Sequence, residues 1–542
     1  MTRHIRVHVG LALVAIIGVA LLFRALPLYW SSLPSTLDGF KYAALAERAV
    51  QTGQIPFEGR ADNLFFTTVL GSVSLLTGVD VLRITQPVAS IIGTASVLVG
   101  IIITRRVVTD SSRLSVNRTN VSLVAGGLLA VEGLFLRRTS VPDEEILGIL
   151  LTLVVAISLH YAFRSGEARW YLIALGILAI FPLLHTFTSF VVGLVVTGLT
   201  VRHVSQTLSI KSLVGGLGIA GGFWAHIALY YRTAETSLSL TVPYVDRVTA
   251  YPGLFLGWVS ILLIVSVWIA YTDTRIRQGL YIGALSALFG VLIVNTLTPV
   301  FPGTVTTPPT VGQLVLVIGV VSLIAVGGLD ILSEYQGASL LTALFFAPAT
   351  IIGFSLTASL TPEYFATAMR AQTFLHLPML VVVGIALGKL LETDRVLLAR
   401  VCVAALFMLA AVSAPLAYLN MDTGSSPSTT LESEYDAVAF ASTEWQRSWT
   451  GDHSITRVGG HQFNSGDLGP TARWLTGGSS PQCAAISQRS WTTTGAHLFP
   501  SSPETVNRDS YHNWLAQRHV IYSNTGTDPV RISTATLDAA RC

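Results

Sequence analysis

Long apolar runs separated by short polar loops occupy most of the chain. A membrane-spanning helix needs about 20 apolar residues, with a rise of ~1.5 Å each. Two shorter runs, 170–185 and 187–201, are separated by "HTFTS" and predict a tight helical hairpin that either spans twice or re-enters. With the longer runs, the pattern predicts about thirteen spans. The longer runs are 7–28, 86–104, 119–136, 146–164, 212–231, 253–271, 279–297, 312–330, 337–357, 373–390 and 396–418.

Basic residues in the short loops indicate the orientation of these spans. Arg and Lys concentrate in the cytoplasmic loops of membrane proteins. The segments "MTRHIR", "TRRVVTDSSRLSVNR", "RSGEAR", "VRHVSQTLSIK" and "DTRIRQ" all fall on one side of the predicted bundle. We therefore expect a multi-pass cell-membrane protein with a cytoplasmic N-terminus and an extracellular C-terminal domain. The first run is expected to be a retained anchor, because no A-x-A-like cleavage site follows it.

The apolar run at 64–78 is too short to span. If it did cross, the pair Arg105 and Arg106 would move to the outer side, against the positive-inside rule. We interpret it as an interfacial or re-entrant helix inside one long exterior loop, residues 29–85.

The pattern changes after residue 420. The segment "MDTGSSPSTT" is typical of a flexible linker over 421–430, and hydrophobicity falls beyond it. We expect an all-α polytopic bundle over 1–420 and a small exterior α+β domain over 431–542. In that domain "HVIYSNTGTDPVRIS" predicts two strands and a turn, and the Trp and Tyr side chains are expected in the core. The domain is expected to begin with a helix, because apolar residues recur there at helical spacing: Tyr435, Val438, Ala441, Trp445 and Trp449.

Composition agrees with the membrane assignment. Of 542 residues, 51% are hydrophobic and only 12% are charged, which is too few charges to coat a soluble globule of this size. The net charge is +3 and the basic residues are dispersed, so nucleic acid is not an expected partner. Cysteines show no metal-site spacing. Cys483 and Cys542 both fall in the predicted exterior domain, where an oxidising environment would allow them to pair.

Three charged clusters fall on the predicted outer side. The first is "LPSTLDGFKYAALAERAVQTGQIPF", in which Asp38 begins a helix that ends at Gly53. As an N-cap, its carboxylate would accept hydrogen bonds from free backbone N–H groups. That role leaves the carboxylate at the membrane surface, so Asp38 is also a candidate for chemistry, together with Lys41 and Tyr42.

The second cluster is "EGLFLRRTSVPDEEILG". Acidic residues in the first turn of a helix are explained by its macrodipole alone. That explanation does not cover two arginines on the outer side, against the positive-inside bias. The cluster contains Arg137, Arg138, Asp143, Glu144 and Glu145.

The third cluster, "TPEYFATAMRAQTFLHLPM", places Arg370 at or just above membrane depth. A cation there needs an anion or water. Arg370 is interpreted either as a snorkelling arginine or as a ligand for a lipid-linked phosphate, and Glu363 and His376 are alternative partners. The three clusters together predict a cavity for an amphiphile, with its polar end at acid and base residues and its tail between helices.

These segments resemble the C-type glycosyltransferases, which use polyprenyl-phosphate or polyprenyl-diphosphate sugars. "LDGFKYAALAERAVQTGQIP" is similar to the family's "D-x-x-Y-x-x-x-A-x-x-x-x-x-x-G-x-x-P" segment, and "SVPDEEILGILL" to its second acidic motif. "EYFATAMRAQTFLHLP" resembles the "Y-F-x-x-x-M-x-R" stretch of oligosaccharyltransferase subunits. The resemblance implies catalysis at Asp38 and Asp143. It implies substrate binding by Arg370, Lys41, Tyr42, Glu144, Glu145, Arg137, Arg138 and His376.

The family resemblance also implies a reaction. We expect an inverting hexosyltransferase that moves a sugar from dolichyl phosphate to a glycan or glycoprotein on the exterior face. The resemblance to archaeal dolichyl-phosphate-mannose mannosyltransferases, which act in S-layer N-glycosylation, implies that the sugar is mannose. Asp38 would be the general base, Arg370 would bind the phosphate, and Asp143 would orient acceptor hydroxyls. No cofactor is expected, although the exterior acids leave a divalent metal open.

Three alternatives stay open. En bloc oligosaccharide transfer is disfavoured, because the W-W-D-Y-G motif is missing and "NTLTPVFPGTVTTPPT" has no acid. A lipid-linked sugar flippase or transporter would use ionisable residues near the membrane midplane, where His160, His185 and His226 are the main candidates. A non-enzymatic anchor or sensor would leave the long first loop unexplained.

Overall fold

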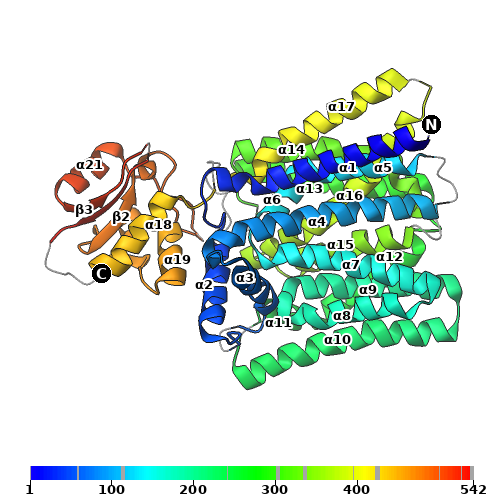
Figure 1. The fold of residues 1–542 in the computed structure, drawn as a ribbon, viewed down its shortest axis with the longest axis horizontal. Coiled ribbons are helices and arrows are strands. Elements are labelled where there is room, and N and C mark those ends of the chain that lie inside the picture. The colour runs from blue at the N-terminus through cyan, green and yellow to red at the C-terminus, as the bar shows by residue number, and fades with distance from the viewer. Residues whose placement is uncertain are drawn as a thin grey trace.

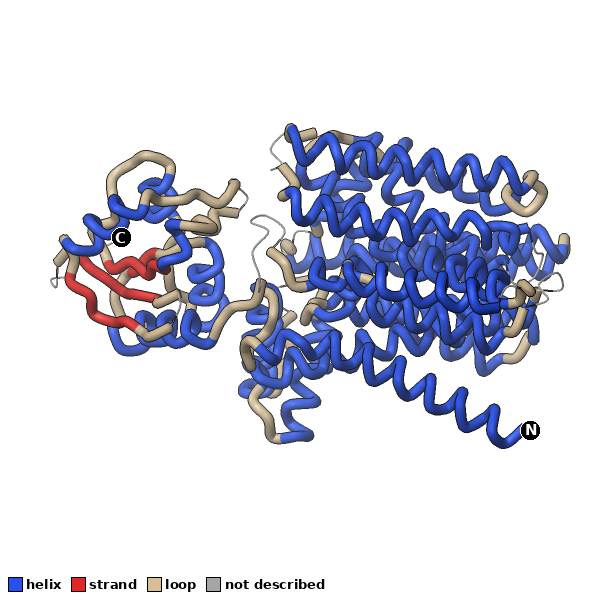
Figure 2. Tube along the Cα trace, turned by 90° about the horizontal axis from the view of Figure 1, so that it is seen from above, coloured by secondary structure: helices blue, strands red, loops and turns tan. Residues whose placement is uncertain are grey.

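The computed structural model has a large helical bundle and a smaller domain that contains a sheet (Figure 1). Among the described residues, all strands lie in the smaller domain (Figure 2). Residues 421–427 of the predicted linker fall outside the described part. The structure describes residues 2–57, 60–111, 116–240, 242–300, 306–333, 338–394, 396–420, 428–499, 501–526, 528–536 and 542.

Each of the predicted apolar runs falls largely within a helix. Ten helices of the described chain are long and apolar enough to cross a membrane, and two bent pairs bring the number to twelve. The remaining predicted run is the shorter apolar helix α8. The bundle contains α1 (Thr2–Ala25), α4 (Val81–Asp110), α5 (Arg118–Val131), α6 (Gly133–Ser140), α7 (Glu144–Ser165), α8 (Ala168–Leu184), α9 (Thr186–Thr207), α10 (Ile210–Leu238), α11 (Pro243–Ala250), α12 (Pro252–Trp268), α13 (Thr274–Leu297), α14 (Pro309–Leu323), α15 (Ala338–Ala358), α16 (Pro362–Leu391) and α17 (Val396–Val412).

The break between α5 and α6 bends the chain by 66° and is stabilised by two buried side chains. Arg24, which is fully buried, donates to the carbonyl oxygens of Leu129 at 3.3 Å and Ala130 at 3.4 Å. Glu132 accepts from the backbone N–H of Phe135 at 2.8 Å. These bonds replace the helical partners that the break removes, which is the usual condition for interrupting a helix in an apolar environment.

Helix α2 (Leu37–Thr52) runs across the end of the bundle, between the bundle and the smaller domain (Figure 1). Its N-cap is Thr36, whose hydroxyl accepts from the N–H of Gly39 at 3.2 Å, so the prediction that Asp38 caps the helix was wrong. Asp38 lies in the first turn instead. Gly53, with φ of 68°, ends the helix as expected. The short apolar run forms α3 (Leu64–Thr77).

The smaller domain contains a four-stranded sheet of order β1-β2-β4-β3. The predicted hairpin is present as the antiparallel pair β3–β4. Trp449 lies in strand β1 rather than on the predicted helix, because the helical region ends at Trp445. Cys483 and Cys542 form a disulfide. The elements are α18 (Glu432–Ala439), β1 (Trp449–Thr450), α19 (His453–Gln462), α20 (Gly469–Leu475), β2 (Ala484–Gln488), α21 (Arg508–Ala516), β3 (His519–Ser523) and β4 (Val530–Thr534).

The segment between α1 and α4 contributes to the core of the smaller domain. Phe40 of α2 is fully buried and packs in the same apolar cluster as Trp449 and Ile486. The side-chain amide of Gln462, at the end of α19, donates to the carbonyl oxygen of Phe40 at 2.7 Å. Helix α2 therefore belongs to both parts of the molecule.

Candidate active site

The first two charged clusters meet because α2 packs tightly against the segment that precedes α7. A Cβ atom added to Gly39 would lie 2.6 Å from Pro34 and 2.8 Å from Pro142. Only a glycine permits this approach without a shift of the backbone. It brings Asp38 beside Asp143, the residue that follows Pro142, close enough for each charge to affect the other.

The third cluster joins them through an ion pair that crosses the bundle. Arg370 of α16 donates from Nη1 to Oε1 of Glu145 at 3.0 Å. Arg138 approaches the other oxygen, Oε2, at 3.6 Å. The Glu145 side chain is 2% exposed, whereas Arg370 is 31% exposed. Arg370 is thus anchored by a buried carboxylate, while part of its side chain stays exposed.

Two aspartates in the cluster have pKa values displaced in opposite directions. Burial and the charge of Asp143 raise the pKa of Asp38 above its usual range, although Arg370 acts in the other direction. Burial would also raise the pKa of Asp143, but its contact with Glu144 and the charge of Arg370 lower it to about 2. Two carboxyl groups whose pKa values differ in this way are suited to different roles, and Asp38 is the stronger base.

The other residues predicted on α2 surround the same site. Tyr42 is 2% exposed, and burial together with the charge of Glu144 raises the pKa of its hydroxyl, which stays protonated and able to donate. The Lys41 ammonium lies 4.9 Å from the centre of the Tyr42 ring. Asp143 also caps α7, since it accepts from the N–H of Glu145 at 3.4 Å.

Two predicted substrate-binding residues lie elsewhere. Arg137 donates to the carbonyl oxygens of Leu416 at 3.2 Å and Leu419 at 2.8 Å, so it holds the segment after α17. Neighbouring residues of α6 point in different directions, which separates it from Arg138. His376 is buried 3.4 Å from Glu132, at the break between α5 and α6. Its position six residues beyond Arg370 puts it on another side of α16.

Sequence reasoning missed several residues at this site. His185, the residue between α8 and α9, lies 3.4 Å from Glu144. Asp62 accepts from the hydroxyl of Thr186 at 2.8 Å and pairs with Arg60 at 3.3 Å. The sequence feature that pointed to Asp62 was its position in the long loop predicted to be exterior. For His185 the signal was the polar interruption "HTFTS" between two apolar runs.

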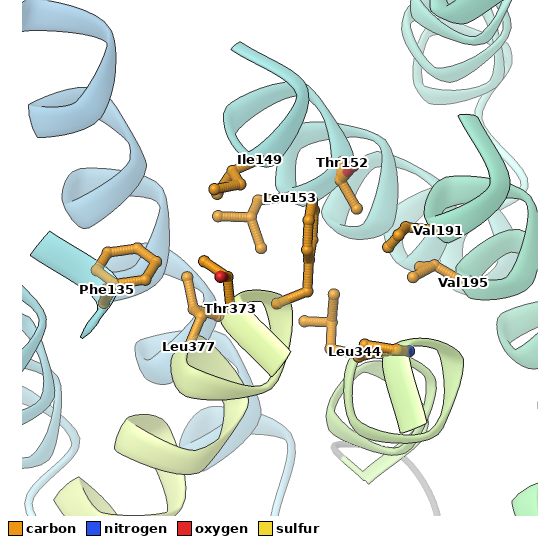
Figure 3. A pocket seen from close by; sticks show the side chains of 11 residues that line it. Phe135, Ile149, Thr152, Leu153, Val191, Val195, Leu344, Thr373 and Leu377 are labelled. Carbon is orange, nitrogen blue, oxygen red and sulfur yellow. The ribbon is translucent and has the colours of Figure 1, made fainter. Parts of the chain in front are cut away.

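Apolar space lies directly beneath the charged groups. Figure 3 shows a cavity surrounded by side chains of α6, α7, α9, α15 and α16, including Phe135, Leu153, Val195, Leu344 and Leu377. Thr373, on the turn of α16 that follows Arg370, also lines it. Its polar lining residues are Thr152 and Thr373, and the amphiphile site stays a prediction.

A second groove carries its own cation. It contains about 340 Å³ of space between atoms, its open mouth included, and lies between α9, α11, α12, α15 and α16. Arg247 lines it, donates to the hydroxyl of Thr367 at 2.7 Å and lies 4.7 Å from the centre of the Tyr244 ring. Aromatic side chains form much of the remaining wall: Phe187, Phe190, Phe255 and Phe354.

Metal binding was left open by the sequence. In the described part of the chain, no three His, Cys, Asp or Glu side chains are grouped so that they could hold one ion. Glu144 pairs with His185, and Glu145 pairs with Arg138 and Arg370.

Comparisons with known proteins give a structural relationship only. No protein-family model matches the chain, and no curated protein matches it by sequence. The oligosaccharyltransferase of Archaeoglobus fulgidus in its apo form matches with a TM-score of 0.55 and 13% identity, over 89% of this chain and 70% of that one.

Two other structures of the same enzyme give similar values. The complex with zinc and sulfate has a TM-score of 0.53 and 15% identity over 84% of this chain, and the form tethered to an acceptor peptide containing the NVT sequon has 0.51 and 14% over 84%. The chain spans 62% and 63% of the length of these two structures. At such identities the match speaks for architecture alone. This multi-pass membrane protein therefore has the C-type glycosyltransferase fold.

Proposed function

We propose that the protein is an inverting glycosyltransferase that moves a sugar from a polyprenyl phosphate to an acceptor hydroxyl at the outer membrane surface. The observation that supports this most is the convergence of Asp38, from the first exterior loop, and Arg370, from a late helix, on the buried carboxylates that open α7. A base and a phosphate-binding cation are the two groups that such a transfer requires.

In this mechanism Asp38 accepts the proton of the acceptor hydroxyl as the oxygen attacks the anomeric carbon. The bond between that carbon and the phosphate oxygen breaks, and the configuration inverts. A positioned base typically contributes ~10²–10⁴-fold to the rate. The raised pKa of Asp38 supports this role, because a more basic carboxylate accepts the proton more readily. Asp143 and Tyr42 orient the reacting groups.

The leaving phosphate gains negative charge and is stabilised by Arg370. Arg247 lies on the same side of α16, since it bonds to Thr367, three residues before Arg370. In this proposal the first units of the polyprenyl chain lie along the aromatic groove beside Arg247. The phosphate then lies between Arg370 and Arg247.

The finer assignment is a dolichyl-phosphate donor, mannose as the sugar, and a glycan or S-layer glycoprotein as the acceptor. Its basis is the resemblance of the short motifs described above. An extracellular smaller domain is supported by the disulfide between Cys483 and Cys542, because disulfides persist in oxidising compartments. The N-terminal end of α1 lies at the opposite end of the bundle from that domain, in keeping with a cytoplasmic N-terminus (Figure 1).

En bloc oligosaccharide transfer is the second candidate. It is favoured by the structural similarity to an oligosaccharyltransferase, including a form that holds an NVT acceptor peptide. A transporter has less support. His160 is engaged by Asp110 at 3.0 Å, and His226 lies 3.2 Å from the carbonyl oxygen of Ala179. His160 therefore belongs to a salt-bridge cluster at the end of α4, where Asp110 also pairs with Arg106 and Arg164.

One reconstitution separates these functions. The purified protein in liposomes is given dolichyl-phosphate mannose labelled in the sugar, a hydroxyl acceptor, and separately a diphosphate-linked oligosaccharide with an NVT peptide. We expect transfer of one labelled sugar with inversion. Transfer of the whole oligosaccharide to asparagine would support the second candidate. Movement of the labelled lipid across the bilayer with no new glycosidic bond would contradict both.

A further inference from the structure

Basic side chains lie along one side of helix α19, which packs against α2. His453, Arg457 and His461 recur every four residues on α19, which places them along one side of the helix. Helix α19 lies beside α2 (Figure 1), and the bond from Gln462 to the carbonyl oxygen of Phe40 fixes its end there. The charge of Arg457 acts on Asp38 across this junction.

Arg60 adds a second arginine from the first exterior loop. It is held by Asp62 at 3.3 Å, and Asp62 is itself fixed by the hydroxyl of Thr186. The charge of Arg60 also acts on Asp38. Burial lowers the pKa of His461 to about 4, and the charges of Arg457 and Arg60 act in the same direction.

The side chain of Arg457 is exposed, and among the described residues it forms no ion pair with a carboxylate. The buried acids Glu144 and Glu145 are matched by His185, Arg138 and Arg370 on the bundle side. A neutral sugar hydroxyl requires no further cation beside the base, whereas an anionic acceptor does.

We propose that the acceptor is a glycan that carries a negative charge, a carboxylate or a phosphate, and that Arg457 and Arg60 bind this group at the junction of α19 and α2. The anion then lies next to the hydroxyl that Asp38 activates. This inference rests on the proposed function and specifies the class of acceptor. His453 and His461 border the same surface as polar neighbours.

Matched acceptors test the proposal on the full-length protein. The probes are a methyl hexuronide, its neutral methyl ester and a hexose phosphate, each assayed with the wild type, Arg457→Gln and Arg60→Gln. We expect either substitution to raise KM for the anionic acceptors about tenfold to a hundredfold, with kcat and the KM of the neutral ester little changed, because a charge-assisted hydrogen bond is lost. The lower KM of the two anionic probes identifies carboxylate or phosphate as the natural group.

Arg508→Gln is the matched control, because Arg508 is an exposed arginine of the same domain at the start of α21, away from the bundle (Figure 1). Equal KM values for charged and neutral acceptors in the wild type would overturn the proposal. If no acceptor is glycosylated, the proposed function fails. Calorimetric measurement of the binding of the methyl hexuronide and the hexose phosphate then tests separately whether the anion site exists. Binding of either that is lost in Arg457→Gln supports the site, and absent or unchanged binding of both refutes it.

Discussion

Asp38 combines three features that a base at a membrane surface needs. It lies in the first turn of α2, and its carboxylate is not needed to cap the helix because Thr36 is the N-cap. It is half-buried, and its pKa is raised by burial and by Asp143. The positive charge of Arg370 also acts on it and favours its ionised form. The neighbouring Asp143 is bound into the start of α7 and is better suited to positioning.

Replacing Asp38 with Asn removes the proposed base and keeps the size of the side chain. We expect kcat to fall ~10²–10⁴-fold with little change in the KM of the donor. Wild-type activity should decline on acidification at a higher pH than an ordinary aspartate would give, because the base must be ionised and its pKa is raised. Steady-state rates across pH measure both effects.

Glu47→Gln is the control for this substitution, since Glu47 is an exposed carboxylate on the same helix. It should retain wild-type rates. Normal turnover of Asp38→Asn, with correct membrane insertion, would exclude Asp38 as the base.

Arg370 is held by Glu145 but stays partly exposed, which fits a residue that receives a phosphate. Substitution with Ala should lower kcat/KM for the lipid-phosphate donor by about 3–4 kcal/mol of transition-state stabilisation. Thermal unfolding in detergent should show a smaller change. Arg232→Ala, at an exposed arginine of α10, is the control. A snorkelling arginine would give unchanged donor kinetics.

At the level of elements, the site depends on how closely α2 approaches the start of α7. Both helices have conventional sequence-encoded ends, with Thr36 and Gly53 bounding α2 and Asp143 opening α7. Their separation is set by Gly39, where a side chain would meet Pro34 and Pro142. The break between α5 and α6 then directs Arg138 toward Glu145.

Gly39→Ala tests this contact. The added methyl group should displace α2 from Pro142 and reduce kcat at least tenfold, because small errors in the placement of catalytic groups are costly. Gly10→Ala in α1, where a Cβ would have nothing within 4 Å, should leave activity intact. Full activity of Gly39→Ala would show that the distance between Asp38 and Asp143 is not critical.

At the level of the whole molecule, the smaller domain covers the end of the bundle where the charged clusters lie. Leu33 and Phe40 of the first loop are part of its core, and the hydroxyl of Ser32 donates to Glu432 at 2.6 Å. The stability of this domain therefore affects the position of α2. One of its carboxyl groups, Glu434, has a pKa raised to about 7, chiefly by burial.

This raised pKa predicts a pH-dependent stability. The folded domain retains the Glu434 proton up to about pH 7, while the unfolded chain loses it near its ordinary pKa of 4.5. The stability contribution is therefore complete below pH 4.5 and declines by ~1.4 kcal/mol per pH unit as pH rises toward 7. Unfolding of the protein at pH 5, 6 and 7 measures it. Glu434→Gln should abolish this slope, and an unaltered slope would contradict the assignment.

Much of the architecture is encoded locally and could be predicted from the sequence. The apolar runs, the hairpin β3–β4 and the ends of α2 follow from hydrophobic periodicity, turn residues and capping residues that are neighbours in the chain. The pairing of Cys483 and Cys542 was left open and is present in the structure. The number of predicted spans between Asp38, Asp143 and Arg370 placed all three residues at the same end of the bundle. Their roles in the reaction stay predictions.

The sequence by itself thus determined the elements of this protein and the side of the bundle on which its charges lie. Only the tertiary structure decided which charges meet. Arg370 pairs with Glu145, 225 residues away, whereas Arg137 and His376 contact other partners. The charge of Arg457, on α19, acts on Asp38. The physical reason is that periodicity and capping act over a few residues, while ion pairs depend on helix rotation and on close approaches, such as that at Gly39, which no local pattern specifies.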